Sequence, residues 1–112
     1  MEIKHQGKSS TGIDANLAAL LSYLLGFITG VIFYTLEKEN KFVRFHALQS
    51  IVTFASLLVL NFIFKLLPVI GWALASLLGI ISILLWIMLM FKAYQGEYFK
   101  LPFAGKIAEQ NS

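Results

Sequence analysis

Three long apolar segments follow one another along the chain, and short polar segments separate them. Residues 15–36 and 69–91 contain no Asp, Glu, Lys or Arg, and residues 45–67 contain only Lys65. Because a helix needs about 20 apolar residues to cross the hydrocarbon core of a bilayer, each segment is long enough to span it. The pattern therefore predicts an all-α integral membrane protein with three transmembrane helices, at about 15–36, 45–67 and 69–91.

The polar segments predict where the chain meets water. Residues 1–12 are polar and predict a flexible tail. Residues 92–112 mix aromatic side chains with lysines, which suits an amphipathic tail that lies along the membrane interface. With 112 residues, the chain is predicted to form a single membrane domain, residues 1–112.

The segment Glu37–Ser50, with the sequence EKENKFVRFHALQS, is the densest group of charges between two apolar segments. Charges beside aromatic rings at the mouth of an apolar helix are typical of a membrane–water interface. We therefore predict that this junction contacts lipid head groups or a partner protein, and that Arg44 contacts anionic head groups. The residues predicted for this interface are Lys41, Phe42, Arg44, Phe45, His46 and Gln49.

Polar side chains continue from this junction into the second predicted helix. His46, Gln49, Thr53 and Ser56 follow a helical spacing and form one stripe. Polar groups within a membrane need hydrogen-bonding partners, so the stripe is predicted to face other helices and not acyl chains.

Small residues recur every four positions in the first and third predicted helices. Such ridges let two helix backbones approach closely in lipid. We predict that these two helices pack side by side and run parallel; the alternatives are that each ridge faces lipid or a second copy of the chain. The residues predicted for helix packing are Ala18, Ser22, Gly26, Gly30, Gly71, Ala75 and Gly79.

The composition and the motifs of the chain limit the classes of function that it can have. Apolar residues make up 58% of the chain and charged residues 13%, more apolar and less charged than is typical of a soluble domain. The chain has no cysteine, and no metalloprotease, nucleophile-elbow or phosphate-loop motif is present. His46 is better interpreted as a hydrogen-bonding residue at the interface than as a catalyst. We predict no enzymatic activity, cofactor, metal or nucleic-acid partner.

The count of Lys and Arg predicts an orientation in the cell membrane. With three spans, the N-terminal tail and the Lys65 turn share one side and carry three of these residues, whereas the other side carries six. Because positive residues concentrate in cytoplasmic segments, the count predicts a multi-pass protein with its N-terminus outside and its C-terminus in the cytoplasm.

Two stretches carry a resemblance to a known family. The sequence from Glu39 to Ser50, ENKFVRFHALQS, and the sequence from Gly96 to Pro102, GEYFKLP, resemble small bacterial and archaeal membrane proteins. These are grouped with the Tic-twenty component of the chloroplast inner-envelope protein translocon. The resemblance extends over residues 11–108 and implies a multi-spanning protein without an established enzymatic activity. The translocon relatives have four spans, whereas three are predicted here.

Two classes of function follow. The first is a membrane scaffold or accessory subunit that contacts lipid head groups or partner proteins. The second is an oligomeric transport or protein-translocation component, which needs further copies or a partner because three helices cannot enclose a pore. No Asp, Glu, Lys or Arg lies deep within a predicted span, where ion pathways usually need one, and this favours the scaffold. The predicted partners are membrane lipids, with a second copy or another membrane protein as a further candidate.

Overall fold

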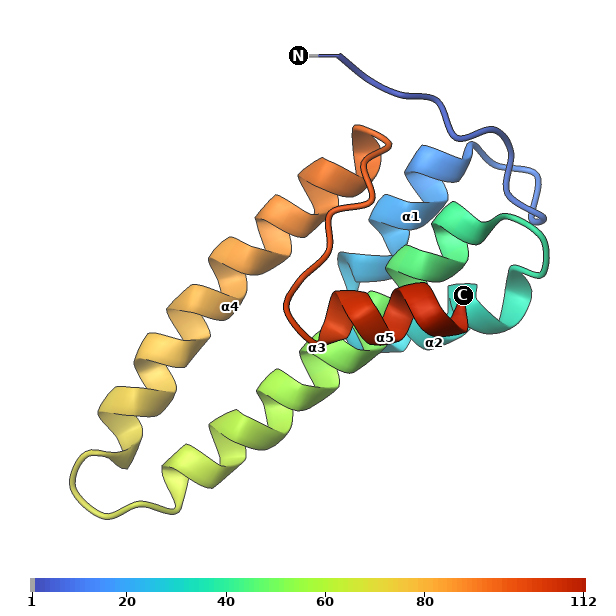
Figure 1. Ribbon diagram of the computed structural model, residues 1–112. Coiled ribbons are helices and arrows are strands. Elements are labelled where there is room, and N and C mark those ends of the chain that lie inside the picture. Colours follow the sequence, from blue (N-terminus) through green and yellow to red (C-terminus); the bar gives the residue numbers. More distant parts are fainter. Residues whose placement is uncertain (1) are drawn as a thin grey trace.

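The structure, a computed structural model, describes residues 2–112 and is built from helices. They are α1 (Ala15–Leu24), α2 (Phe27–Leu36), α3 (Lys41–Lys65), α4 (Gly71–Tyr94) and α5 (Ala104–Asn111), shown in Figure 1. Within these residues no strand forms, although Lys8 and Asp14 make an isolated β-bridge. The prediction of an all-helical protein is confirmed.

The longest elements, α3 and α4, form an antiparallel hairpin. They contain 25 and 24 residues and are long and apolar enough to cross a membrane. At 1.5 Å per residue each measures roughly 36–38 Å, against a hydrocarbon core of about 30 Å. They correspond to the second and third predicted spans. The hairpin closes tightly at Gly71, because a Cβ atom there would lie 2.2 Å from the carbonyl oxygen of Phe64.

The first predicted span, residues 15–36, is not one helix. It breaks at Leu25 and Gly26 into α1 and α2, which have 10 residues each and are too short to cross. Gly26 has a φ of +63°, a conformation that side-chain-bearing residues rarely adopt. The hydroxyl of Thr29 stabilises the break, because it accepts from the amide of Leu25 at 3.1 Å and donates to the carbonyl of Ser22 at 3.0 Å.

Because of this break, α2 runs back alongside α1, and the end of α2 lies near the start of α1. Ser9 and Ser10, which precede α1, hydrogen-bond to the carboxylate of Glu37, which follows α2. The amide of Lys4 donates to the carbonyl of Gln95 at 2.8 Å, just beyond α4. The N-terminal segment, predicted to be a flexible tail, is therefore held in place from Lys4 onward; Met1 lies outside the described residues.

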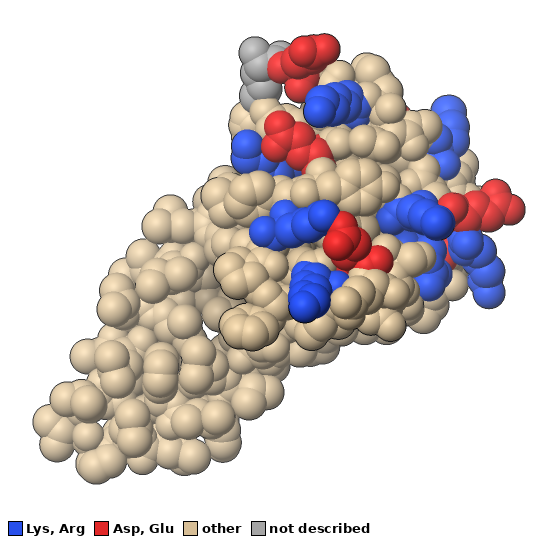
Figure 2. All heavy atoms as spheres, viewed as in Figure 1, with Lys and Arg blue, Asp and Glu red and all other residues tan. Residues whose placement is uncertain are grey.

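These contacts place both termini and the Glu37 loop at the same end of the molecule (Figure 1). This arrangement differs from the prediction of three straight spans with the termini at opposite ends, because the first apolar segment turns back at Gly26 instead of forming one long helix. We call residues 2–53 and 83–112 the head and residues 54–82 the stem. In Figure 2, the charged side chains gather over the head, and the visible face of the stem carries none.

The small-residue ridges do not meet as predicted. The indole of Trp86 donates to the carbonyl of Tyr23, and the side chain of Asn16 donates to the carbonyl of Tyr94. Residues later in α1 thus pair with residues earlier in α4, so the two helices run antiparallel. The contact uses the end of α4 remote from Gly71, and a Cβ atom on Gly79 would meet only open space.

The small residues of the two ridges instead make contacts with different neighbouring elements. In α2, Gly30 packs against α3, where a Cβ atom would lie 2.8 Å from the carbonyl oxygen of Ala47. In α1, Ala18 packs against Val43 of α3, and Ser22 is buried and donates to its own helix. Ala75 accepts a hydrogen bond from Asn61 within the stem. The short α1 explains this outcome, because it never reaches the part of α4 that carries Gly71, Ala75 and Gly79.

Because both termini lie at the same end of the molecule, cysteines introduced into this cysteine-free chain should follow a definite labelling pattern. We expect single cysteines at Ser10 and Gln110 to react equally with a membrane-impermeant thiol reagent on intact cells. A cysteine at Val69, which is 98% exposed at the tip of the stem, should show the opposite reactivity. Opposite labelling of Ser10 and Gln110 would contradict the fold.

Candidate functional site

The centre of the head is a buried chain of polar side chains from α1 and α3. The hydroxyl of Tyr23 lies 2.6 Å from Nδ1 of His46, and Nε2 of Gln49 donates to the same hydroxyl at 2.9 Å. Nε2 of His46 lies 2.7 Å from the carbonyl oxygen of Glu97. All three side chains are fully buried.

These distances define the direction of each hydrogen bond. The carbonyl oxygen of Glu97 can only accept, so Nε2 of His46 carries the proton. Nδ1 is then an acceptor, and the hydroxyl of Tyr23 must donate to it while it accepts from Gln49. The whole chain of bonds is satisfied with a neutral imidazole. Buried polar networks that are fully paired make a fold specific and rigid.

The same glutamine holds the C-terminal segment against α3. Gln49 donates to the carbonyl of Phe99 at 2.8 Å and accepts from the amide of Leu101 at 2.9 Å. Its amide group thus has partners on both its oxygen and its nitrogen. The rings of Phe42 and Phe45 pack edge-on against His46, and the ring of Tyr98 packs against both of them.

A second polar cluster joins the N-terminal segment to the α2–α3 corner. The carboxylate of Glu37 is fully buried and accepts from the hydroxyls of Ser9 and Ser10 and from the amides of Ser10 and Asn40. Burial alone raises the pKa of Glu37, but these hydrogen bonds, with Ser10 and Ser9 contributing most, outweigh it and lower the pKa to about 2. Asn40 also caps α3, because its side chain accepts from the amides of Phe42 and Val43.

The residues predicted for a lipid or partner interface lie largely inside the head. Phe42, Phe45, His46 and Gln49 are buried, and only Lys41 is exposed. The prediction that the polar stripe faces other helices is confirmed for His46 and Gln49, whereas Ser56 is exposed. Aromatic residues interleaved with charges occur both where the rings are exposed to lipid and where they are buried in protein. The sequence pattern alone therefore does not distinguish the two cases.

Arg44 also binds protein groups. Its Nη1 atom donates to the carbonyl oxygens of Glu37 at 2.7 Å and Tyr34 at 3.2 Å, and its Nε atom donates to the carbonyl oxygen of Ser112 at 3.2 Å. The guanidinium carbon lies 4.3 Å from the centre of the Tyr34 ring. Arg44 therefore ties α2, α3 and the C-terminal segment together, and its contact with anionic head groups stays a prediction.

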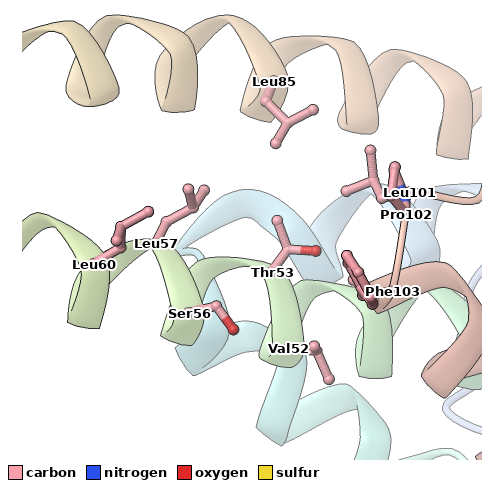
Figure 3. Close-up of a pocket in the computed structure, with 10 residues that line it drawn as sticks. Val52, Thr53, Ser56, Leu57, Leu60, Leu85, Leu101, Pro102 and Phe103 are labelled. Carbon is pink, nitrogen blue, oxygen red and sulfur yellow. The ribbon is translucent and has the colours of Figure 1, made fainter.

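An apolar groove of about 340 Å³ lies below the polar centre, between α3, α4 and the C-terminal segment. Figure 3 shows Thr53 and Leu57 of α3 facing Leu85 of α4, with Phe103 at the side of the groove. The hydroxyl of Thr53 is buried without a hydrogen-bonding partner. Within residues 2–112, no three His, Asp or Glu side chains are close enough to hold a metal ion.

Several residues that organise the head have no local signal in the sequence. Tyr23 lies in an apolar segment, and Glu37 is one of several charges in the segment Glu37–Ser50. Ser9 and Ser10 were assigned to the flexible tail. Only the fold brings these four residues to their partners, since each bond between them joins positions more than 20 residues apart.

Comparison with known proteins places this architecture in a family. Residues 9–108 match the model of the magnetosome magnetite crystal formation protein family. The chain belongs to this family. It is 54% identical to the UPF0132 membrane protein MJ1443 of Methanocaldococcus jannaschii over 95% of this chain and 96% of the relative. It is 48% identical to a UPF0132 membrane protein of Archaeoglobus fulgidus over 85% of this chain and 92% of the relative.

These relatives confirm the expected family of small archaeal membrane proteins, whereas none of the matches shows the Tic-twenty grouping. No solved structure matches the chain. The family match covers both polar clusters and the C-terminal segment, and it omits only the first eight and last four residues.

The low pKa of Glu37 predicts an acid-sensitive fold. Because the folded-state pKa lies below the ordinary 4.5, this carboxylate stabilises the head above about pH 5, and its contribution is lost as the pH falls toward 2. Replacement by glutamine, E37Q, should lower the free energy of unfolding at pH 7 by roughly 1.5–3 kcal/mol, the range for hydrogen bonds to charged groups. Unfolding in detergent micelles, followed by circular dichroism between pH 7 and 3, measures both effects.

In E37Q the loss of stability between pH 5 and pH 3 should be smaller than in the wild type. The control is E39Q, because Glu39 is exposed in the same loop. Equal acid sensitivity in the wild type and E37Q would show that Glu37 does not stabilise the head.

Gln49 should hold the C-terminal segment in place. The variant Q49L leaves the carbonyl of Phe99 and the amide of Leu101 without their partner, at about 1–3 kcal/mol for each buried group. We expect trypsin to cleave at Lys100 and Lys106 faster in Q49L than in the wild type, measured by mass spectrometry of timed digests. Q110L, at an exposed glutamine of α5, is the matched control. Unchanged cleavage in Q49L would contradict this role.

Proposed function

We propose that the chain is a non-enzymatic membrane scaffold, in which the α3–α4 hairpin crosses the bilayer and the head contacts lipid head groups on one side. The observation that carries this proposal is the one-sided distribution of charge. All six Asp and Glu residues and every Lys and Arg residue except Lys65 belong to the head. The longest dimension of the molecule is 49 Å, so part of the head extends beyond a hydrocarbon core of about 30 Å.

We place the head in the cytoplasm. Positive residues concentrate in the cytoplasmic segments of membrane proteins, and the stem contributes Lys65 alone among nine Lys and Arg residues. Both termini are then cytoplasmic. This orientation replaces the one predicted from three spans.

Exposed lysines form the surface for lipid contact. Among the described residues, salt bridges join Lys92 to Glu97 and Lys100 to Glu109. Lys38 and Lys41, at the corner between α2 and α3, are exposed and take part in neither pair. Each lysine near an anionic membrane surface contributes about 1 kcal/mol of attraction. The two lysines are therefore well placed to hold anionic head groups.

The hydrogen bonds of the buried polar side chains in the head also support a scaffold. Tyr23, His46 and Gln49 are each bonded to protein atoms, so their role in holding segments together accounts for them. A transport or translocation role would need several copies, because α3 and α4 alone cannot surround a pore. The family description refers to magnetite crystal formation, and we do not extend that role to this chain; we extend to it only the membrane setting that the names of its relatives give.

The proposal predicts a preference for anionic lipid. The double variant K38Q/K41Q should retain less phosphatidylglycerol, relative to phosphatidylcholine, than the wild type after purification from mixed micelles. The expected loss is up to about thirtyfold, since each of the two lysines contributes about 1 kcal/mol and about 1.4 kcal/mol corresponds to a factor of ten. Quantitative lipid mass spectrometry measures the ratio.

K65Q at the tip of the stem is the control and should retain the wild-type ratio. If K38Q/K41Q and K65Q retain the same ratio as the wild type, the head does not select anionic lipid, and the scaffold proposal loses its lipid partner.

A further inference from the structure

The head and the stem differ in cross-section along the path through the membrane. The stem consists of α3 and α4 alone, whereas at the level of the head α1 and α2 lie beside them. Each helix is roughly 10 Å across. The molecule therefore occupies about twice the area at one level that it occupies at the other.

The turn between α1 and α2 marks where this change occurs. The hydroxyl of Ser50 donates to the carbonyl of Gly26 at 2.8 Å, and a Cβ atom on Gly26 would lie 3.6 Å from Phe54. Ser50 and Phe54 are near the midpoint of α3, and Ser82 and Ile83, which line a small pocket with Gly26, are at the midpoint of α4. A helix of 10 residues rises about 15 Å, half of the hydrocarbon core. The turn therefore lies at the middle of the bilayer.

The polar backbone groups of the turn are paired, as a position in hydrocarbon requires. Irregular backbone is tolerated at membrane depth only where its polar groups are paired. Here the amide of Leu25 and the carbonyl of Ser22 bond to Thr29, the amide of Gly26 bonds to the carbonyl of Tyr23, and the carbonyl of Gly26 bonds to Ser50. A turn in water would need no such partners.

The outer faces of α1 and α2 are apolar and uncovered. Leu25 at the turn is 62% exposed and Ile28 is 52% exposed. The occupant that fits them is the acyl chains of one leaflet, because these faces flank a turn that is itself paired for hydrocarbon. The C-terminal segment adds to the width of the head. Phe103 lines a groove with Thr53, and Ser112, beyond α5, accepts a hydrogen bond from Arg44.

We infer that the chain is a membrane wedge that senses and promotes curvature, with the leaflet around the head on the convex side. The α1–α2 hairpin displaces acyl chains in one leaflet and none in the other. A convex leaflet has more area at the level of the head, so insertion is more favourable where the bilayer already bends in that direction. This inference rests on the one-sided insertion in the proposed function, but it does not depend on contacts between lysines and head groups.

The first test measures depth. Nitroxide labels on single cysteines at Leu25, Ile83 and Leu36 are compared in phosphatidylcholine vesicles by their accessibility to oxygen and to a water-soluble nickel complex. We expect Leu25 and Ile83 to report the same depth, near the bilayer centre, and Leu36, at the end of α2, to be shallow. A shallow label at Leu25 would overturn the inference.

The second test measures curvature preference in pure phosphatidylcholine, whose neutral head groups remove the contribution of the lysines. The fluorescently labelled full chain is reconstituted into a mixture of small sonicated and large extruded vesicles. We expect protein per lipid to be about two- to tenfold higher in the small vesicles, a preference of up to about 1.4 kcal/mol. Quenching of a label at Asn111, which is exposed, should place the head outside. Equal density, or enrichment with the head inside, would overturn the inference.

Two double variants separate shape from charge. L25K/I28K places two lysines at the deep turn and should expel the hairpin from the leaflet and abolish the curvature preference. H5K/Q110K adds two lysines at exposed positions of the head and should retain it. Circular dichroism and mass photometry in detergent check helix content and oligomeric state.

If L25K/I28K keeps the preference, the hairpin is not its cause and the inference fails. If L25K/I28K converts an oligomer to a monomer, the hairpin faces protein and not lipid, which also overturns it. Loss of anionic-lipid selection in K38Q/K41Q with an intact curvature preference would leave the wedge in place, so the two proposals can fail separately.

Discussion

The pairing of backbone polar groups where the first apolar segment turns back is the constraint on which the fold depends. An unpaired amide or carbonyl in hydrocarbon costs several kcal/mol, so a turn within an apolar segment is compatible with lipid only if side chains supply the missing bonds. Thr29 and Ser50 supply them at Gly26. Once this turn exists, α1 and α2 end where they began, and both termini are brought to one end of the molecule.

The two polar clusters of the head follow from that arrangement. Glu37 can receive Ser9 and Ser10 only because α2 returns to the start of α1. Tyr23 can reach His46 and Gln49 only because α1 lies against α3. Charged and polar side chains that would be costly in lipid are thereby concentrated at one end, where either water or protein partners satisfy them.

The stem has a simpler role in the same arrangement. It carries no charge except Lys65, whose ammonium lies 5.1 Å from the centre of the Trp72 ring at the far end. In the proposed function this long apolar hairpin anchors the head in the membrane. The functional proposals therefore depend on features of the head: its exposed lysines and the two short helices that widen one leaflet.

The sequence by itself indicated the class of the protein, because a chain of 112 residues is too small to bury three long apolar segments in a core of its own. It also determined the two long helices α3 and α4, since each corresponding apolar segment, 45–67 and 69–91, exceeds the thickness of the core. The tertiary structure alone decided whether residues 15–36 form one long helix or two short ones. A paired turn at Gly26 and a straight helix with a small-residue ridge have the same local pattern, and the bond from Ser50 that distinguishes them comes from a residue 24 positions away. For the same reason the buried roles of Tyr23, Glu37 and Arg44 could not be predicted: each depends on partners that only the folded chain brings together.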